Sequence, residues 1–376
     1  MKILLIGNYE LGDARSMPRF GEMLRRELAA RGHEVELLRA KAVLGGLGGG
    51  DTNSGGLSKY LSYVDMYVIF PLRVWLRSGR RWNAVHICDH SNAVYGRWVR
   101  GRKPSVTCHD LLGIQRGEGK FPQLRVGRMG RRQQQWIKRS LLAIQRVVCV
   151  SRATERDLRA MGFAGETRVI ANPLNEDFHP ASNDRVREVR QAIGLGGAEP
   201  YVLHVGGNLW YKNRPGLVRI FAALRKFGAD FASLRFVMAG HPFNDELRAE
   251  VSRLGLGAQV IEMVDPPNDV VEALYTDASL LLFASLHEGF GWPIVEAQTL
   301  GCPVATSNRE PMVEVAGGAA MLVDPEDAEG AAAVIATEWP RRAELRERGY
   351  GNAARFSREQ LIGEYEDFLS EEWRRE

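Results

Sequence analysis

Short apolar runs alternate with longer amphipathic stretches along the whole chain. Apolar runs bounded by turn residues are typical of buried strands, whereas apolar positions three or four residues apart are typical of helices. In the first half, this pattern predicts strands at 2–7, 34–38, 84–88, 105–108 and 146–150. It predicts helices there at 16–31, 91–100, 126–144 and 153–161. Alternating strands and helices indicate an α/β fold with a parallel sheet.

The second half repeats this organisation. The pattern predicts strands at 201–205, 234–239, 259–263, 280–283 and 303–306. It predicts helices at 213–227, 244–254, 270–275 and 293–300. Pro173 disfavours helix at Asn172 and suits a linker, and a length of 376 residues favours two domains. We therefore expect domains at 1–172 and 173–355, followed by a helix at 356–376.

The segment from Glu288 to Glu296 carries the strongest candidate chemistry. It follows a predicted strand, turns at Gly289 and Gly291, and enters a helix at Pro293. The unpaired N–H groups at the start of such a helix bind anions. Glu296 lies about one turn into the helix, so both carboxylates can reach hydroxyl groups held beside the anion. This arrangement suits the binding of a nucleotide-sugar.

A second loop, at 204–215, also follows a predicted strand. Gly206 and Gly207 precede Lys212, and Asn213 is the expected N-cap of the next helix. A departing diphosphate gains negative charge in the transition state, and a fixed ammonium group with helix N–H groups stabilises that charge without needing a metal ion. We therefore expect Lys212 to be a catalytic residue.

The sequence HEGFGWPIVEA at 287–297 resembles the signature of the retaining GT-B glycosyltransferases of family GT4. The resemblance covers most of the chain and is strongest from 201 to 325. It implies two Rossmann-like domains with parallel sheets facing a central cleft, and a C-terminal helix that packs back on the first domain. It also implies a hexosyltransferase-type reaction, in which a sugar moves from a nucleotide-diphosphate sugar to an acceptor hydroxyl with retained anomeric configuration.

The same resemblance implies roles for individual residues. Glu288 contacts the donor sugar hydroxyls, and Glu296 holds the ribose. His109, just past a predicted strand end, joins Lys212 and Glu288 as a catalytic residue, acting as a hydrogen-bond donor or polar stabiliser. The expected donor-binding residues are Gly7, Gly206, Gly207, Asn208, Lys212, Gly289, Phe290, Gly291 and Glu296.

Two loops depart from the family pattern. Many members carry an arginine just before or within the lysine loop, where this chain has Asn208 and Tyr211, and Arg214 comes after Lys212. Members often show two adjacent glycines after the first strand, where this chain has only Gly7. From this first loop we expect acceptor contacts at Asn8 and Arg15. The segment Asp89-His90-Ser91 follows another strand end, so we expect His90 to line the acceptor side as well.

Two other functions remain open. A GT-B nucleotide-sugar epimerase or hydrolase would use the same donor site without an acceptor. A non-catalytic protein that binds sugar nucleotides would keep the fold, although Glu288, Glu296, Lys212 and His109 together argue against it. No DxD motif stands at a convincing strand end, so we expect no metal ion, and no cofactor beyond the donor co-substrate.

The net charge of +4 conceals two halves of opposite sign. Residues 1–172 carry 30 Lys and Arg against 14 Asp and Glu, a net charge of +16, whereas the remainder carries 20 against 32, a net charge of −12. The basic half favours an anionic partner such as a membrane surface or a lipid diphosphate, a domain interface, or an arginine-rich solvated surface. The basic helix at 126–144, which contains Trp136, suits either a membrane surface or solvent. No recognised nucleic-acid-binding module accompanies the charge.

The four cysteines lack CxxC spacing and lie in or beside apolar segments, which suits reduced thiols in the cytoplasm. No run approaches the ~18 apolar residues of a membrane span, and the first residues predict a strand rather than a signal peptide. We therefore expect a cytoplasmic protein that binds a nucleotide-sugar donor and a sugar, glycolipid or glycan acceptor. Peripheral association with the inner face of the membrane is an alternative that the basic half leaves open.

Overall fold

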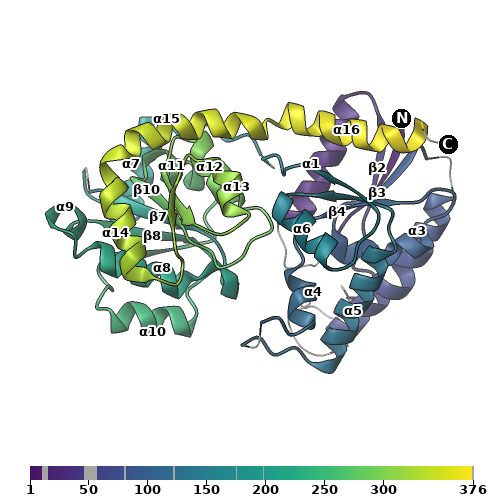
Figure 1. Ribbon diagram of the computed structural model, residues 1–376, viewed down its shortest axis with the longest axis horizontal. Coiled ribbons are helices and arrows are strands. Elements are labelled where there is room, and N and C mark those ends of the chain that lie inside the picture. Colours follow the sequence, from purple (N-terminus) through teal and green to yellow (C-terminus); the bar gives the residue numbers. More distant parts are fainter. Residues whose placement is uncertain are drawn as a thin grey trace. The chain divides into compact units, whose positions relative to one another are not determined.

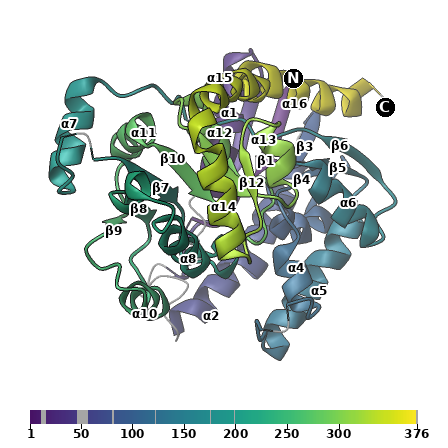
Figure 2. The same cartoon turned by 60° about the vertical axis from the view of Figure 1, so that its left-hand side comes forward.

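The computed structural model describes residues 1–10, 16–45, 57–79, 82–121, 123–174, 176–197 and 199–374. The chain divides into two compact units. Unit 1 comprises Met1–Glu176 together with Arg358–Glu376, and unit 2 comprises Asp177–Ser357. Each unit has its own six-stranded parallel sheet, with helices on both faces (Figure 1 and Figure 2).

The sheet of unit 1 has the strand order β2-β1-β3-β4-β5-β6. Its strands are β1 (Lys2–Ile6), β2 (Glu34–Leu38), β3 (Ala84–Ile87), β4 (Ser105–Cys108), β5 (Arg146–Cys149) and β6 (Glu166–Val169). The central strands are apolar nearly throughout because helices bury both faces of the sheet. The strand order reverses between β1 and β3, and ligands of such sheets bind outside the carboxyl ends of the strands at this switch point.

Helices cover this sheet on both sides. They are α1 (Ser16–Ala30), α2 (Leu57–Val64), the π-helix η2 (Asp65–Ile69), α3 (Phe70–Ser78), the 3-10 helix η3 (His90–Trp98), α4 (Leu112–Gly117), α5 (Arg128–Leu142), α6 (Arg152–Ala160) and α16 (Arg358–Arg374). The hydroxyls of Tyr365 and Thr107 lie 3.2 Å apart, and Arg31 donates to Glu366 at 3.1 Å. The expected packing of the C-terminal helix on the first domain is therefore confirmed.

The sheet of unit 2 has the strand order β12-β11-β10-β7-β8-β9, which is the order of dinucleotide-binding Rossmann folds. Its strands are β7 (Tyr201–Val205), β8 (Arg235–Gly240), β9 (Val260–Val264), β10 (Leu280–Phe283), β11 (Val304–Ser307) and β12 (Met321–Val323). The order reverses between β7 and β10, so the switch point of unit 2 lies there.

Unit 2 also has helices on both faces of its sheet. They are α7 (Asn183–Ala192), η4 (Trp210–Lys212), α8 (Arg214–Leu224), α9 (Ala229–Ala232), α10 (Asp245–Arg253), α11 (Asn268–Asp277), α12 (Trp292–Thr299), α13 (Met312–Ala316), α14 (Ala328–Glu338), η5 (Trp339–Arg341), α15 (Arg342–Ala353) and η6 (Ala354–Phe356). The core includes Phe221 and Phe236, whose rings are 5.0 Å apart. Each unit thus holds its own switch point on its own core.

The α/β prediction is confirmed, and every predicted strand is present. The pattern does not predict the edge strands β6, which has one apolar residue among four, and β12, which has only three residues. The helix predicted at 91–100 is instead the 3-10 helix η3, which begins where Asp89 accepts a hydrogen bond from the Ser91 N–H. All four cysteines are buried and free of disulfide bonds. No helix of the described residues is long and apolar enough to cross a membrane.

Candidate functional site

The loops that follow β7 and β10 meet at the switch point of unit 2. The Leu286 N–H donates to the carbonyl oxygen of Tyr211 at 2.7 Å. The rings of Trp210 and His287 lie 5.5 Å apart. Because β7 and β10 are adjacent parallel strands, their loops leave the same edge of the sheet. The two candidate loops of the sequence therefore form one site.

Lys212 and Glu288 form an ion pair between these loops. The Lys212 Nζ lies 2.8 Å from the Glu288 Oε1, and the two side chains are only 15% and 9% exposed. The Nζ also lies 5.1 Å from the ring centre of Phe283. Shielding from water strengthens electrostatic interactions, and the pairing compensates two charges that would be costly to bury singly.

The start of α12 has the glycine turn and the proline that the sequence predicts. Gly291 is its N-cap, with φ 109°, a left-handed conformation that glycine adopts without strain. Pro293 lies in the first turn, as predicted, and has no N–H to offer. The Ile294 N–H donates to the Gly291 carbonyl oxygen at 3.0 Å, so the anion site expected at this helix end stays a prediction. Glu296 follows in the next turn, where the Tyr275 hydroxyl donates to its Oε2 at 2.9 Å.

Two predicted donor-site side chains make structural contacts. Phe290 is 4% exposed, and its ring lies 5.6 Å from that of Phe356. Asn208 donates from Nδ2 to the carbonyl oxygen of Pro242 at 2.6 Å, and its Oδ1 accepts from Arg214. These contacts fix the shape of the loops that carry Glu288 and Lys212.

Asn213 lies at the N-cap position of α8, but its side chain does not cap the helix. Its backbone is left-handed, with φ 57°, and its Nδ2 donates to the carbonyl oxygens of Ala284 at 3.2 Å and Pro325 at 2.9 Å. The prediction of a side-chain cap is therefore wrong, because two carbonyl acceptors engage the amide. A Cβ at Gly216 would lie 2.2 Å from the Asn213 Oδ1, so this packing requires glycine there.

Arg214, the arginine that follows Lys212, is buried beneath the loop rather than displayed on it. It is 3% exposed, and its Nη1 donates to the His241 carbonyl oxygen at 3.0 Å. Burial lowers the pKa of Arg214 to about 10. Its guanidinium lies 5.0 Å from the ring centre of Phe243. Through these contacts Arg214 holds the conformation of the loop.

Gly206 lies against the backbone of the neighbouring strand and against a buried histidine. A Cβ at Gly240 would lie 2.1 Å from the Gly206 carbonyl oxygen, and a Cβ at Gly206 would lie 2.9 Å from the His204 Nε2. His204 is fully buried, and its Nδ1 donates to the Leu282 carbonyl oxygen at 3.2 Å. Burial lowers the pKa of His204 to about 3, so its ring is neutral. Gly207 follows beside His241.

Asn8 and Asp89 meet across the switch point of unit 1. The Asn8 Nδ2 donates to the Asp89 Oδ2 at 2.7 Å, and the Ser91 N–H donates to Oδ1 at 2.8 Å. The His90 Nδ1 lies 3.4 Å from the same carboxylate. Burial by itself would raise the pKa of Asp89, but His90, His109 and these hydrogen bonds lower it. The buried carboxylate therefore stays ionised.

His109 follows β4 beside this carboxylate. It is 5% exposed, its Nε2 donates to the Cys88 carbonyl oxygen at 2.9 Å, and its ring packs edge-on against Phe20 at 4.8 Å. Burial lowers the pKa of His109, although Asp89 opposes the shift. In the neutral ring the proton is on Nε2, so Nδ1 is the acceptor nitrogen.

Three of the four acceptor-side or catalytic residues expected in unit 1 thus lie together, namely Asn8, His90 and His109. The fourth, Arg15, lies outside the described residues. Gly7 continues the sheet, donating its N–H to the Leu38 carbonyl oxygen at 2.9 Å.

Asp89 belongs to the segment after a strand end that the sequence places on the acceptor side. Tyr275 is a residue that the structure adds. Its sequence surroundings carry no signal, since it reaches Glu296 from a different helix, α11.

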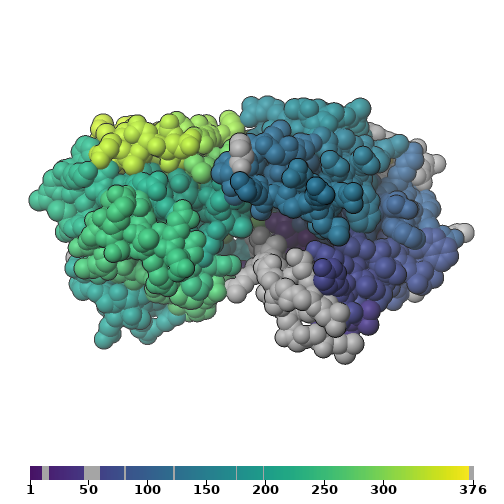
Figure 3. Space-filling model, turned by 90° about the horizontal axis from the view of Figure 1, so that it is seen from below, coloured from purple at the N-terminus to yellow at the C-terminus, as the bar shows by residue number. Residues whose placement is uncertain are grey.

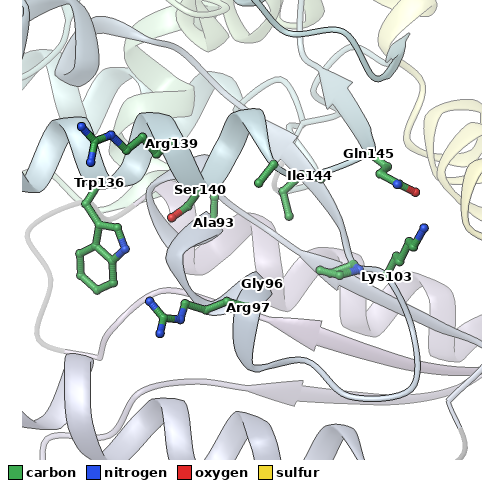
Figure 4. Close-up of a pocket in the computed structure, with 11 residues that line it drawn as sticks. Ala93, Gly96, Arg97, Lys103, Trp136, Arg139, Ser140, Ile144 and Gln145 are labelled. Carbon is green, nitrogen blue, oxygen red and sulfur yellow. The ribbon is translucent and has the colours of Figure 1, made fainter.

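A cavity of about 400 Å³ lies between η3 and α5 in unit 1, away from the predicted site residues. Figure 4 shows Trp136, Arg139 and Arg97 at one end of it and Lys103 at the other. Among the described residues, no group of three or more His, Cys, Asp or Glu side chains could hold a metal ion.

Both halves of the chain match family models. Residues 186–355 match "Glycosyl transferases group 1", and residues 19–178 match "Glycosyltransferase Family 4". The chain belongs to the GT4 family of glycosyltransferases. The resemblance expected from the Glu288–Glu296 segment is therefore confirmed.

Relatives within the GT4 family are moderately similar in sequence. The Escherichia coli O-antigen chain mannosyltransferase B is 28% identical over 174 residues, which are 45% of this chain and 44% of that protein. A GDP-mannose:cellobiosyl-diphosphopolyprenol alpha-mannosyltransferase of Komagataeibacter xylinus is 28% identical over 237 residues, 60% of this chain and 56% of that protein. The chain thus spans about half the length of the curated relatives that it matches.

Solved structures show that the whole chain has the GT-B fold of this family. The sucrose-phosphate synthase of Thermosynechococcus elongatus covers 100% of both chains with a TM-score of 0.76 at 18% identity. Anabaena HepE in complex with UDP and glucose covers 99% of this chain and 100% of its own, with a TM-score of 0.73 at 17% identity. At these identities the likeness concerns the fold alone.

Proposed function

We propose that this protein is a retaining glycosyltransferase that moves a hexose from a nucleotide-diphosphate sugar to an acceptor hydroxyl. The donor binds at the β7/β10 switch point of unit 2. The acceptor contacts the cluster of Asn8, Asp89, His90 and His109 in unit 1. The relatives named for O-antigen and diphosphopolyprenol mannosyl transfer support a glycolipid or polysaccharide acceptor.

The observation that carries the proposal is the shielded ion pair between Lys212 and Glu288. A nucleotide-diphosphate sugar presents anionic phosphates next to neutral sugar hydroxyls. The diphosphate draws the ammonium group of Lys212, and the sugar hydroxyls then donate to the carboxylate of Glu288. Each charge of the pair thus exchanges its partner for a group of the ligand, so neither is left buried and unpaired.

The remaining contacts in unit 2 fit the other parts of that ligand. The positive end of the helix dipole at the start of α12 suits a phosphate. Glu296, oriented by the Tyr275 hydroxyl, suits the two ribose hydroxyls. Together these groups would supply the charge stabilisation that a metal ion supplies elsewhere, so we propose that transfer needs no metal ion.

The reaction is balanced within donor and acceptor. The bond between the anomeric carbon and the diphosphate oxygen breaks, and a bond to the acceptor oxygen forms on the same face of the sugar. The acceptor proton passes to the departing phosphate. Lys212 stabilises the negative charge that develops there, which is worth about 10²–10³ in rate for one preorganised donor in other enzymes.

Calorimetry and a transfer assay test this proposal. The protein is titrated with UDP-, GDP-, ADP- and dTDP-hexoses, beginning with GDP-mannose because that name recurs among the relatives. We expect one nucleotide class to bind and its sugar to be transferred only when a glycan or glycolipid acceptor is added. Nucleotide release without an acceptor would favour a hydrolase or epimerase. Binding without any turnover would favour a non-catalytic protein, and no binding would overturn the donor site.

A further inference from the structure

One continuous helical segment of unit 1 displays an unusually apolar surface. It runs through α2, η2 and α3, from Leu57 to Ser78. Its exposed large apolar side chains are Tyr60 (66% exposed), Val64 (36%), Val68 (63%), Leu72 (55%), Trp75 (40%) and Leu76 (57%). These six residues form what we call the apolar stripe. They are six of the 14 exposed large apolar side chains among the described residues, so exposure is concentrated on this one segment.

The helix geometry places the apolar stripe on one face. Its members from Tyr60 to Leu76 are spaced four residues apart, with Trp75 one place earlier. In an α-helix each four-residue step overshoots a full turn by about 40°, so a long stripe would wind around the helix. The π-helix η2 has wider turns, because its hydrogen bonds join residues five apart. It therefore offsets this drift between Val64 and Leu72, and π-helical turns are frequently found at functional sites.

The opposite face of the segment is held firmly by the rest of unit 1. Phe70 and Val74 are buried in its core. Asp65 is buried and accepts hydrogen bonds from the backbone N–H groups of Leu44 at 3.0 Å and Gly45 at 2.8 Å. The apolar stripe is thus the outward face of an anchored helix. Figure 3 shows residues in the colour range of this segment at the molecular surface.

The charges around the apolar stripe are mostly positive. Asp65 is the one acidic residue of the segment, and it is buried. The guanidinium of Arg100 lies 4.4 Å from the ring centre of Trp75. The ring of Trp136 packs on that of Tyr67 at 5.2 Å, which places the basic end of the cavity in Figure 4 beside the segment.

The three cationic side chains at this border have no ion-pair partner within the part of the chain that the structure describes. They are Arg97, Arg100 and Arg139. One acidic side chain lies at this border, because Arg77 pairs with Glu36 at 3.6 Å. A solvated protein surface usually intersperses both signs of charge, whereas cations predominate here. That combination suits the headgroup region of a bilayer that contains anionic lipid.

We propose that the apolar stripe is an interfacial anchor that lies in the surface of an anionic bilayer, with Arg97, Arg100 and Arg139 contacting lipid phosphates. An aromatic and aliphatic face beside basic residues is the composition of helices that lie in this plane, and tryptophan favours the interface. The basic helix α5 supplies charge to this surface, but its one exposed large apolar side chain is Met129. This anchor does not depend on the proposed catalytic function.

Vesicle co-sedimentation of the full chain tests the anchor. Vesicles of phosphatidylcholine alone are compared with vesicles that also contain phosphatidylglycerol. We expect binding that needs the anionic lipid and weakens as salt rises. The variant Val68→Gln/Leu72→Gln removes two members of the apolar stripe at exposed helical positions, so it should fold normally. Burial of one such side chain in the bilayer raises the affinity for vesicles roughly tenfold. The double variant should therefore bind vesicles at least about tenfold more weakly.

Matched controls separate the apolar stripe from general surface effects. Met129→Gln/Phe227→Gln removes two exposed apolar side chains, 74% and 44% exposed, that lie outside it. This control should bind vesicles like the unaltered protein. Reversing Arg128, Arg131 and Arg132 on α5 tests charge alone and should cause a smaller, salt-dependent loss.

Other outcomes would overturn the proposal. Equal binding by the Val68→Gln/Leu72→Gln variant, or binding to neutral and anionic vesicles alike, would remove the anchor. A dimer that the same variant abolishes in sedimentation velocity, without vesicle binding, would make the apolar stripe an interface between two copies. Absence of both vesicle binding and self-association would also refute the anchor. Transfer to a short soluble acceptor should be unchanged in the double variant, which keeps this test separate from that of catalysis.

Discussion

The two units have the same kind of switch point, but different types of side chain meet there. In unit 2, opposite charges from the β7 and β10 loops meet as Lys212 and Glu288. In unit 1, the amide of Asn8 meets the carboxylate of Asp89 across β1 and β3. The first arrangement offers one charge of each sign, whereas the second offers one fixed carboxylate among neutral donors and acceptors.

In the proposed reaction, this difference divides donor and acceptor binding between two similar folds. A diphosphate must be met by positive charge, and the ammonium of Lys212 is a compact point charge on a flexible stem. A neutral hydroxyl needs only oriented hydrogen-bonding groups, which Asp89 and the two histidines supply. The predictions below test that division, beginning with the largest expected effect.

Lys212→Ala should lower turnover by ~10²-fold or more, because it removes a preorganised charge at the departing diphosphate. Steady-state kinetics with a saturating acceptor measure the loss. The matched control is Lys226→Ala, since Lys226 forms an ion pair with Glu329 at 2.9 Å in the same unit, but with both side chains well exposed (69% and 68%). A near-normal rate for Lys212→Ala would place the charge stabilisation elsewhere.

The two glutamates of the β10 loop and α12 should have separable effects. Hydrogen bonds to charged groups contribute about 1.5–3 kcal/mol. Glu296→Ala should therefore weaken binding of the free nucleoside diphosphate by about tenfold or more. Glu288→Ala should leave that binding largely intact and impair use of the sugar. Calorimetry with the nucleoside diphosphate alone distinguishes them, and equal losses in both variants would contradict the assignment.

Tyr275→Phe sharpens the same test. It keeps the ring and removes the hydroxyl that donates to Glu296 at 2.9 Å. We expect a smaller loss of nucleotide affinity than for Glu296→Ala, because the carboxylate remains but is less firmly oriented. A loss as large as that of Glu296→Ala would show that orientation, rather than the carboxylate itself, limits binding.

His109→Ala should leave donor affinity largely intact and lower the transfer rate, by about tenfold for one lost hydrogen-bonding partner. His109→Gln is the conservative control, because its side-chain amide can still donate to the Cys88 carbonyl oxygen. If the role of His109 is only structural, His109→Gln should restore the full rate. If the ring acts on the acceptor, the rate should stay low while the acceptor KM rises.

The smallest effect concerns a feature that both switch points share, a buried neutral histidine. Burial lowers the pKa of His204 to about 3, below its ordinary 6.5. The unfolded chain therefore binds one more proton than the folded chain as pH falls from 6.5 towards 3. The free energy of unfolding should fall by about 1.4 kcal/mol per pH unit for this group. His204→Phe should flatten that slope in urea unfolding between about pH 6 and pH 4.

His86 in unit 1 allows the same measurement on a second buried histidine. Burial also lowers its pKa to about 3, but both ring nitrogens are hydrogen-bonded, to Ser105 at 2.9 Å and Thr107 at 2.8 Å. His86→Phe should flatten the slope equally and lower stability at pH 7 by a further ~1–3 kcal/mol, because two buried hydroxyls lose a partner. An unchanged slope in either variant would show that the folded ring is already charged.

Local patterns in the sequence account for the site wherever the chemistry lies within one loop. Gly291 and Pro293 predict the turn and the start of α12 because both act on their own backbone. The ion pair between Lys212 and Glu288 spans 76 positions, so each residue can be singled out but not their contact. Tyr275 reaches Glu296 from a separate helix, and its sequence surroundings carry no mark of that role.

The segment of the apolar stripe shows a second limit. Its residues are apolar on both the buried and the exposed face, so the helical period is blurred, and Pro71 interrupts the pattern. The helical period is recognised from the alternation of an apolar and a polar face. A helix with an apolar side on both its buried and its exposed face lacks this alternation. The edge strands β6 and β12 are missed for other reasons. β6 (Glu-Thr-Arg-Val) has a single apolar residue and is only partly buried, and β12 has only three residues.

The packing of the β7 loop has an evolutionary consequence. Its ends are fixed sterically, since no side chain fits at Gly240 against Gly206, and Gly216 must stay small beneath Asn213. Between those ends, Leu209 is 55% exposed, and its neighbours Trp210 and Tyr211 are partly exposed. A substitution at Leu209 disturbs neither glycine contact. If the donor binds here as proposed, mutation can explore new donor preferences at Leu209, while selection against misfolding acts mainly on the glycines at the margins of the loop.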